Sequence, residues 1–224
     1  MTLTVPIDTS PPAVQAHDRI DFTTRTTTSH TAILANAVWG GEHLELGSTR
    51  AAEPVPHLAT ASIVTPRIVA LDVLEHVVDE EAWIACFAHL LAPGGSLTIR
   101  VPVEGPVAWL DALNIFRYVQ DVTGLGKQPL ETKMKGWHRH YRRTGLEGML
   151  ERAGLKPVEV TRSGSPHHDI PHLGALAWGT IVVGDRETEL RAGERRKQAE
   201  AGTDLPRLGP LSTKVTIRAT KPRE

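Results

Sequence analysis

The stretch that most constrains the fold is residues 67–102, RIVALDVLEHVVDEEAWIACFAHLLAPGGSLTIRVP, which carries the signals of a strand, a helix and a second strand in succession. Residues 67–71 are a short apolar run of β type, and residues 97–101 alternate apolar with polar side chains before Pro102, which has no donor for a ladder. Between them, residues 79–91 have acids in the first turn and apolar side chains every three or four positions, and a Pro-Gly-Gly sequence follows. This pattern predicts one α/β unit.

The segments on either side of this unit predict more strands and helices. In the N-terminal part, residues 19–23 predict a strand, residues 31–38 a short helix and residues 43–46 a second strand, which together give a β-α-β order. Downstream, Thr144 and Glu147 have the spacing of a capping box. The elements expected there are a helix at 106–124, the capped helix at 145–153, a strand at 156–162 and a closing strand within 214–222.

Length and composition favour a single domain without a charged partner. A chain of 224 residues with 40% hydrophobic residues can bury one substantial core. A net charge of −1 gives no field that would recruit nucleic acid or an anionic membrane. We expect a Pro-rich arm at residues 1–18 and one domain at 19–224, with an insertion or lid at 163–211 between the last two strands.

Cysteine content and hydropathy indicate the compartment. Cys86 is the one cysteine and falls on the apolar side of the helix predicted at 79–91, so we expect a buried, inert thiol and no disulfide. No apolar run approaches the ~20 residues that span a bilayer, and the N terminus lacks the signals of a secretory leader. These features predict a soluble, cytoplasmic protein.

Three motifs carry a resemblance to a known family. LDVLEHVVDEEAW, LLAPGGSLTIRVP and GWHRHYRRTGLEGMLERAGL occur in this order and resemble the carboxyl-half motifs of class I S-adenosylmethionine-dependent methyltransferases. The resemblance extends from about residue 19 to the C terminus. It implies a Rossmann-like α/β fold with a mostly parallel, doubly wound sheet that is shortened in its N-terminal half.

The positions that hold the cofactor in this family are degenerate here. The three glycines of the family's first turn correspond to Thr23, Arg25 and Thr27, where Cβ atoms block the close approach that the cofactor needs. Gly47 stands where the family has an acid that binds the ribose, and residues 48–66 are too short for the usual helix, strand and adenine-contacting acid. We therefore expect that S-adenosylmethionine does not bind in the usual mode.

Acidic and histidine residues follow the predicted strand 67–71, at the carboxyl end of the sheet, where such folds bind ligands. The resemblance implies that Asp72, Glu75 and His76 match the acid-x-x-Glu-His ligands that hold magnesium in some quinone-biosynthetic methyltransferases. A divalent metal is therefore one hypothesis. The alternative, in which Glu75 and His76 only hydrogen-bond the neighbouring turn, is the one we favour.

Histidines supply the second candidate chemistry. Of the eleven in the chain, six fall in segments that this topology brings to the carboxyl edge: His76, His138, His140, His167, His168 and His172. Because imidazole titrates near neutrality, such residues suit proton transfer or metal binding, although histidines in loops often only pack or lie on the surface. We expect two or three of them to function, with His138, His140, Glu75 and Tyr141 as the catalytic candidates.

Three functions agree with these features. The first is a diverged methyltransferase fold that has lost S-adenosylmethionine binding and performs cofactor-free or metal-assisted acid/base chemistry of the isomerase, cyclase or lyase type on a small biosynthetic intermediate. The second is a non-catalytic pseudo-methyltransferase that forms a subunit of a true methyltransferase, or a homodimer. The third is an active small-molecule methyltransferase. We rank them in this order, because a fold alone does not decide a function.

Overall fold

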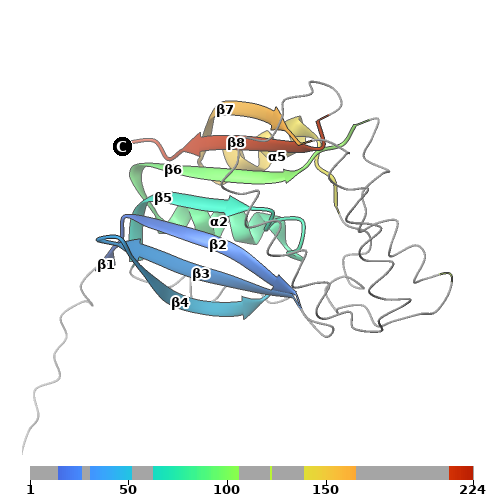
Figure 1. Ribbon diagram of the computed structural model, residues 1–224. Helices are drawn as coiled ribbons and strands as arrows, with labels where there is room; N and C mark the ends of the chain where they lie inside the picture. Colours follow the sequence, from blue (N-terminus) through green and yellow to red (C-terminus); the bar gives the residue numbers. More distant parts are fainter. Residues whose placement is uncertain are drawn as a thin grey trace, which may run out of the picture.

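The computed structural model describes residues 15–26, 31–51, 63–105, 122, 139–164 and 212–223, which form a mixed β-sheet with helices packed on one face (Figure 1). The strands are β1 (Gln15–Ala16), β2 (Arg19–Thr26), β3 (Thr31–Trp39), β4 (Glu42–Arg50), β5 (Ile63–Leu71), β6 (Leu91–Pro102), β7 (Lys156–Ser163) and β8 (Lys214–Thr220), and the helices with described bounds are α2 (Glu80–Leu90) and α5 (Arg143–Arg152). The sheet order is β4-β3-β2-β5-β6-β8-β7, and β1 pairs with β5 beside β2. Counted from β2, the first five strands have the 3-2-1-4-5 order of a doubly wound fold.

The predicted α/β unit is confirmed in β5, α2 and β6. Asp79 is the N-cap of α2, and its side chain accepts a hydrogen bond of 2.9 Å from the backbone N–H of Ala82. At the other end of the helix, Lys221 Nζ donates to the carbonyl oxygens of Ala88 and Leu91 at 2.9 Å each, which satisfies carbonyls that the helix leaves open. The residue that follows the closing strand β8 thus holds the end of α2, while β8 itself pairs with β6.

The predicted N-terminal helix is wrong, because residues 31–38 belong to strand β3. Successive β3 side chains alternate between buried and half-buried, which is the two-residue period of a strand packed on one face. Gly40 and Gly41, with φ of 57° and 87°, form the two-residue turn to β4, a turn that requires positive φ at both positions. The N-terminal part is therefore a three-stranded antiparallel meander and not a β-α-β unit.

The sheet is mixed, which corrects the expected mostly parallel pairing, whereas the doubly wound strand order is as expected. β2, β4, β5, β6 and β7 run in one direction, and β3 and β8 run in the other. The reversal of β3 follows from its hairpin connection to β2, because a short turn can only return the chain antiparallel. In the part of the chain that the structure describes, α2 and α5 lie on the same face of the sheet, behind it in Figure 1.

One hydrophobic core joins the meander to the α/β unit. Phe22 of β2 packs against Trp83 and Phe87 of α2, with ring centroids 6.1 and 4.7 Å apart, and Ile33 of β3 belongs to the same buried cluster. The N-terminal strands are therefore an integral part of the domain.

Of two predictions about the ends of helix α5, one is wrong and one is confirmed. Arg142, not Thr144, precedes the first residue of α5 and no side chain caps that end, so the predicted capping box is wrong; Glu147 instead pairs with Arg143 at 2.8 Å. Gly154, with φ of 77°, follows the helix as expected.

Several segments named from the sequence are not described. Residues 1–14 of the expected arm, most of the helix at 106–124 and all but the first two residues of the 163–211 insertion lie outside the described residues. The last part of the expected arm enters the sheet as β1. None of the described helices combines the length and apolarity that crossing a membrane requires.

Candidate functional site at the carboxyl edge of the sheet

The chain leaves β5 through a turn that lies at the carboxyl edge of the sheet. Asp72 adopts a left-handed backbone conformation, with φ of 56°, and its N–H donates to the carbonyl oxygen of Arg100 at 2.9 Å. At the end of the turn, the Val78 N–H donates to the carbonyl oxygen of Ala51, just beyond β4, at 3.1 Å. The apolar side chains of the turn are fully buried in the core: Val73, Leu74 and Val77. The turn therefore bridges the α/β unit and the end of the meander.

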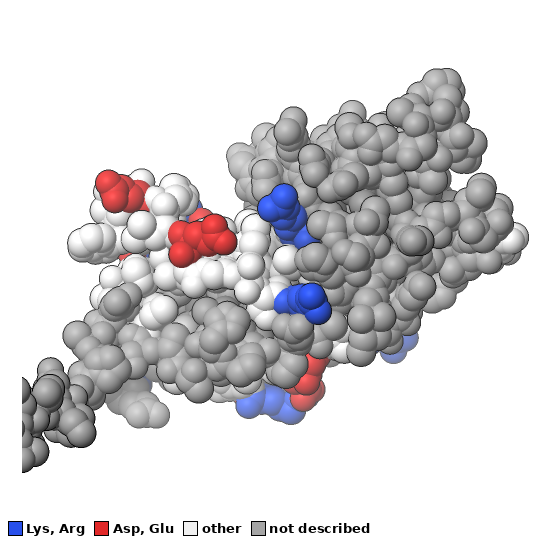
Figure 2. Space-filling view, turned by 90° about the horizontal axis from the view of Figure 1, so that it is seen from below, with Lys and Arg blue, Asp and Glu red and all other residues white. Residues whose placement is uncertain are grey.

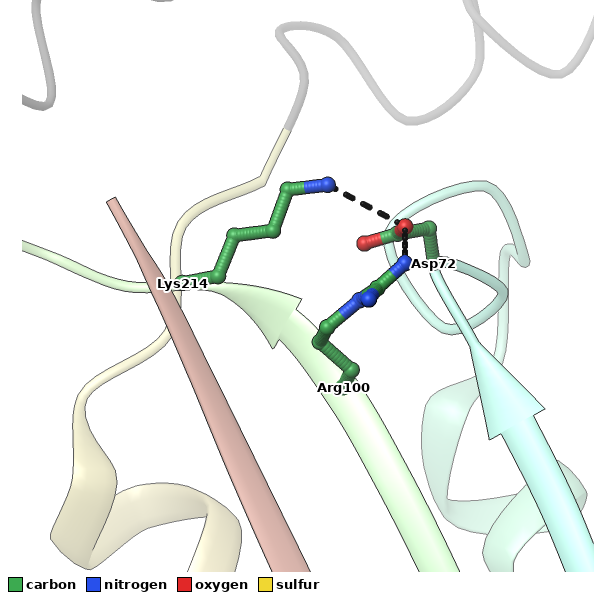
Figure 3. A network of polar contacts seen from close by, with 3 residues as sticks. All are labelled: Asp72, Arg100 and Lys214. Atoms are coloured by element: carbon green, nitrogen blue, oxygen red, sulfur yellow. Dashed lines mark hydrogen bonds and ion pairs between the residues drawn. The ribbon is translucent and has the colours of Figure 1, made fainter. Parts of the chain in front are cut away.

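An ion cluster joins three adjacent strands at this edge (Figure 3). Asp72 Oδ2 lies 2.6 Å from Arg100 Nη2 on β6 and 3.2 Å from Lys214 Nζ at the start of β8. The side chains are 5%, 7% and 17% exposed, respectively. Lys214 reaches this edge because β8 runs opposite to β5 and β6, so its first residue lies beside their last. The cluster is a buried, charged group at the position where doubly wound folds bind ligands.

A second polar group ties the segment before α5 to the same turn. Glu80 Oε1 lies 2.7 Å from Arg139 Nη1 and 3.1 Å from the Tyr141 hydroxyl, and that hydroxyl also donates to the carbonyl oxygen of Leu74 at 2.8 Å. Burial, followed by the negative charges of Glu80 and Glu75, raises the pKa of the Tyr141 hydroxyl far above its usual range. A buried, neutral phenol with these bonds suits a structural link better than a proton carrier.

The residues just before α5 lie at the carboxyl edge of the sheet. Tyr141 forms a bridge with Val103, and its N–H donates to the Pro102 carbonyl at 3.0 Å, so the residues before α5 run beside the end of β6. His140 is therefore at the carboxyl edge and is half-buried. His138, His167, His168 and His172 lie outside the described residues.

The proposed metal ligands gain no support from the geometry. Asp72 carries two cationic partners, and Glu75 is buried at 3% exposure. Within the described ranges, no group of three or more His, Cys, Asp or Glu side chains is arranged to hold a metal ion, which includes Asp72, Glu75 and His76. A cation would also be repelled by Arg100 and Lys214.

The positions of the family's cofactor contacts do not fit S-adenosylmethionine in the usual mode. Thr23 and Arg25 are in the middle and near the end of strand β2, where they pair with Leu34 and Ala32 of β3. The next described element is strand β3, which begins at Thr31, so a strand stands where the family has the helix whose open N-terminus faces the cofactor. Gly47, with φ of 140°, sits at a β-bulge opposite β3, and Thr27 is outside the described residues.

Sequence reasoning missed Arg100 and Lys214. Arg100 occupies a polar position of an alternating strand, where a basic side chain normally indicates solvent, and Lys214 begins a strand 142 positions after Asp72. Only the sheet order, with β6 between β5 and β8, brings the three residues together.

Comparison with protein families identifies the class of this chain. The model of the methyltransferase domain family matches residues 40–160, which are 121 of the 224 residues. The chain belongs to this family, and its fold is that of the class I S-adenosylmethionine-dependent methyltransferases. No curated protein has a sequence that matches the chain.

Solved structures with a similar fold are only distant in sequence. A Galdieria sulphuraria protein described as a sarcosine dimethylglycine methyltransferase shows 11% identity and a TM-score of 0.39, with 72% of this chain and 60% of that chain covered. Phosphoethanolamine N-methyltransferase 2 of Haemonchus contortus, in complex with S-adenosyl-L-methionine, shows 13% identity and a TM-score of 0.38, with 71% of this chain and 34% of that chain covered. The [4+2]-cyclase SpnF shows 13% identity and a TM-score of 0.39, with 70% of this chain and 49% of that chain covered. The chain thus spans between a third and three fifths of the lengths of these proteins.

Proposed function

We propose that this methyltransferase-fold protein acts on a small biosynthetic intermediate by acid/base chemistry, without S-adenosylmethionine held in the family's usual mode. The observation that carries the proposal is the β2–β3 hairpin, in which Arg25 pairs with Ala32 and Thr26 with Thr31. The ladder uses the backbone groups that a Gly-rich turn would leave open toward a cofactor.

The reversed direction of β3 supports the same proposal. In a doubly wound fold the second strand ends at the carboxyl edge, and an acid there binds the ribose. Gly47, which corresponds to that acid in sequence, lies in β4, one strand farther from β2. The strand beside β2 is β3, which ends at Trp39, on the opposite edge from Asp72, because it is antiparallel to β2 and β2 is parallel to β5. The end of β3 therefore has no route to a ribose at the usual site.

The proposed chemistry uses residues of the C-terminal half. His140, beside the end of β6, is the described candidate for moving a proton, since histidine is the side chain that most readily gains and loses one near pH 7. The negative charge of Glu75 contributes to raising the pKa of Tyr141, so this acid lies near the same segment. An isomerisation, elimination or cyclisation needs only such proton transfers. His138 stays a second candidate from the sequence.

Calorimetry with S-adenosylmethionine and its demethylated product tests the central claim. We expect no saturable heat from either ligand at concentrations up to the order of 1 mM, a free energy of binding weaker than about 4 kcal/mol. Micromolar affinity for either compound would overturn the proposal and make the chain an active methyltransferase.

A variant pair tests whether the edge is catalytic. In cells that accumulate the protein's product, His140→Gln should lower product formation by on the order of a hundred- to ten-thousand-fold, the usual contribution of a general acid or base. His43→Gln, on the exposed strand β4, is the matched control and should leave product formation unchanged. Melting temperatures of both variants should stay close to that of the wild-type protein, so that lost activity is not lost folding.

One observation favours a non-catalytic subunit as the second candidate. Trp39 and Leu44, next to the β3–β4 turn and on β4, are 59% and 43% exposed, and β4 is the last strand of the described sheet. Seen from the β4 side, the described surface is mainly uncharged, with acidic and basic side chains in small separate groups (Figure 2). Such an edge suits a protein partner. For this function, Trp39→Ser should abolish the stimulation of a partner methyltransferase, and His140→Gln should not.

A further inference from the structure

We propose that Arg100 and Lys214 form a binding subsite for a carboxylate group of a small-molecule ligand. The inference adds the chemical class of the substrate to the proposed function. It rests on that function only for the statement that the bound ligand is a substrate. Three features of the cluster carry it: its unbalanced charge, its spare donors and its position.

Among the described residues, the cluster holds one more positive than negative charge. In the described part of the chain, Asp72 is the single ion-pair partner of Arg100 and of Lys214, and both cations meet the same oxygen, Oδ2. Two cations and one carboxylate give a net charge of +1 in a group that is between 5% and 17% exposed. Keeping an unbalanced charge away from water is unfavourable, and one additional negative group removes that penalty.

Arg100 has donors available for a second carboxylate. Its Nη2 binds Asp72, and its Nε, which lies on the same edge of the guanidinium as Nη2, is buried and has no hydrogen-bond partner. A guanidinium presents five N–H groups in a planar fork that matches the two oxygens of a carboxylate. The opposite edge of the fork, formed by Nη1 and the second N–H of Nη2, is the one suited to bind a planar anion.

The pair lies at the same edge of the sheet as the candidate proton carrier. Lys214 is the most exposed member of the cluster, and it lies at the carboxyl edge next to Val103, whose N–H donates to the carbonyl oxygen of Thr213 at 3.0 Å. The same edge holds His140, through the bridge between Val103 and Tyr141. A ligand whose carboxylate met Lys214 and Arg100 would thus place its remaining atoms along the edge that carries the candidate proton carrier.

The charge of the cluster selects between a carboxylate and a phosphate. A monoanionic carboxylate brings the net charge of the cluster to zero, whereas a phosphate dianion leaves an excess negative charge. Inorganic phosphate is therefore the discriminating second probe, and chloride at equal ionic strength removes the effect of screening.

The test measures the thermal stability of the full chain in sodium acetate, sodium phosphate and sodium chloride at matched ionic strength. We expect a saturable rise in melting temperature with acetate relative to chloride, as for any ligand that binds only the folded state, and a smaller response to phosphate. Lys214→Met removes one cation and one charge-assisted hydrogen bond, and it should weaken the apparent acetate affinity at least about tenfold. Lys156→Met, on exposed β7 at the opposite edge, is the matched control and should behave as the wild-type protein.

Asp72→Asn provides a change of the opposite sign. It raises the cluster to a charge of +2, so acetate should bind this variant more tightly than the wild-type protein, even though the variant is less stable. The proposal is overturned if acetate does not stabilise the wild-type protein beyond chloride, if Lys214→Met responds as the wild type does, or if only phosphate gives a saturable effect. Binding of S-adenosylmethionine would overturn the proposed function and leave these outcomes unchanged, so the two failures can be told apart.

Discussion

The two halves of the sheet contribute to one core through different connections. In the C-terminal half, α2 joins β5 to β6 and α5 precedes β7, whereas in the N-terminal half β2, β3 and β4 follow one another antiparallel. Both halves place alternate strand side chains on the helix-covered face, such as Ile33 in β3 and Ile99 in β6. The packing requirement is therefore met with or without crossover helices.

The difference in connections decides where a site can form. Parallel strands bring all of their carboxyl ends to one edge, but in a meander successive turns alternate between the two edges. The Gly40–Gly41 turn thus lies at the edge opposite Asp72, and β3 contributes its first residue, not its last, to the carboxyl edge. The charged cluster and the histidine segment are accordingly supplied by the C-terminal half.

The largest effect is expected from removing a side chain of the N-terminal half that packs against the C-terminal half. Phe22→Ala deletes the ring that contacts Trp83 and Phe87, and we expect it to lower the free energy of unfolding by about 3–5 kcal/mol because a cavity is left in a close-packed core. Urea titration measures the loss. Val158→Ala, at a side chain that is 49% exposed on β7, is the control and should change stability by less than about 0.5 kcal/mol. A small effect of Phe22→Ala would mean that the meander is an independent unit.

The next largest effect is expected where the C-terminal half buries charge. Asp72→Asn keeps the size of the side chain and its tolerance of positive φ, but leaves Arg100 and Lys214 without their counter-ion, and should destabilise the protein by about 3 kcal/mol. Asp21→Asn makes the same change in the half-exposed pair with Arg19 on β2. Its effect should stay below about 1 kcal/mol. Equal losses of stability in the two variants would show that the ion cluster at the carboxyl edge contributes no more than an exposed ion pair.

A pH series probes helix α2, which packs against strands of both halves. Burial raises the pKa of the Cys86 thiol from 9.0 to about 12, so above pH 9 the unfolded chain loses this proton while the folded chain keeps it. Stability should therefore fall as pH rises from 9 toward 12, by up to about 1.4 kcal/mol per pH unit from this residue. Cys86→Ala should reduce that slope and leave the slope below pH 8 unchanged. Identical slopes in the two proteins would indicate that the thiolate is accommodated in the fold.

The smallest effects are expected from two glycine-to-alanine substitutions that should change stability in opposite directions. Gly41 has φ of 87° and an added Cβ would meet nothing within 4 Å, so Gly41→Ala should destabilise by about 1 kcal/mol through backbone conformation alone. Gly145 in α5 also has open space, and Gly145→Ala should stabilise by about 0.5–1 kcal/mol because alanine favours a helix. Thermal unfolding of both variants measures the two shifts. A neutral Gly41→Ala would mean that the β3–β4 turn adopts another conformation in solution.

Sequence patterns predicted the C-terminal half well because its local signals agree. Asp79 caps α2, apolar residues repeat at helical spacing, and β6 alternates before Pro102. Residues 31–38, TAILANAV, were misjudged because Ala, Ile and Leu are common in both helices and strands, so composition did not separate the two. The usable signal was Gly40-Gly41 between two apolar runs, which indicates a hairpin.

The site was harder to predict than the fold. Glu75, His140 and Tyr141 were assigned to the carboxyl edge from topology, and the structure places them there, but no local pattern tells a buried, bonded Tyr141 from a reactive one. Asp72 was singled out from its position after a strand. Its partners could not be predicted from sequence, because Arg100 and Lys214 come from β6 and β8, and they meet Asp72 only because of the order of the strands in the sheet.

The β2–β3 hairpin also sets the order in which the chain can fold. Thr26 and Thr31, which pair at its tip, are five positions apart, whereas Ile20 and its partner Ile68 in β5 are 48 positions apart. Closing the longer loop loses about 2 kcal/mol more chain entropy, so local pairing in the meander precedes its docking onto β5. A methyltransferase sheet normally has to bring its first two strands together across an intervening helix. Here the meander can serve as a preformed template on which the central parallel strand is recruited.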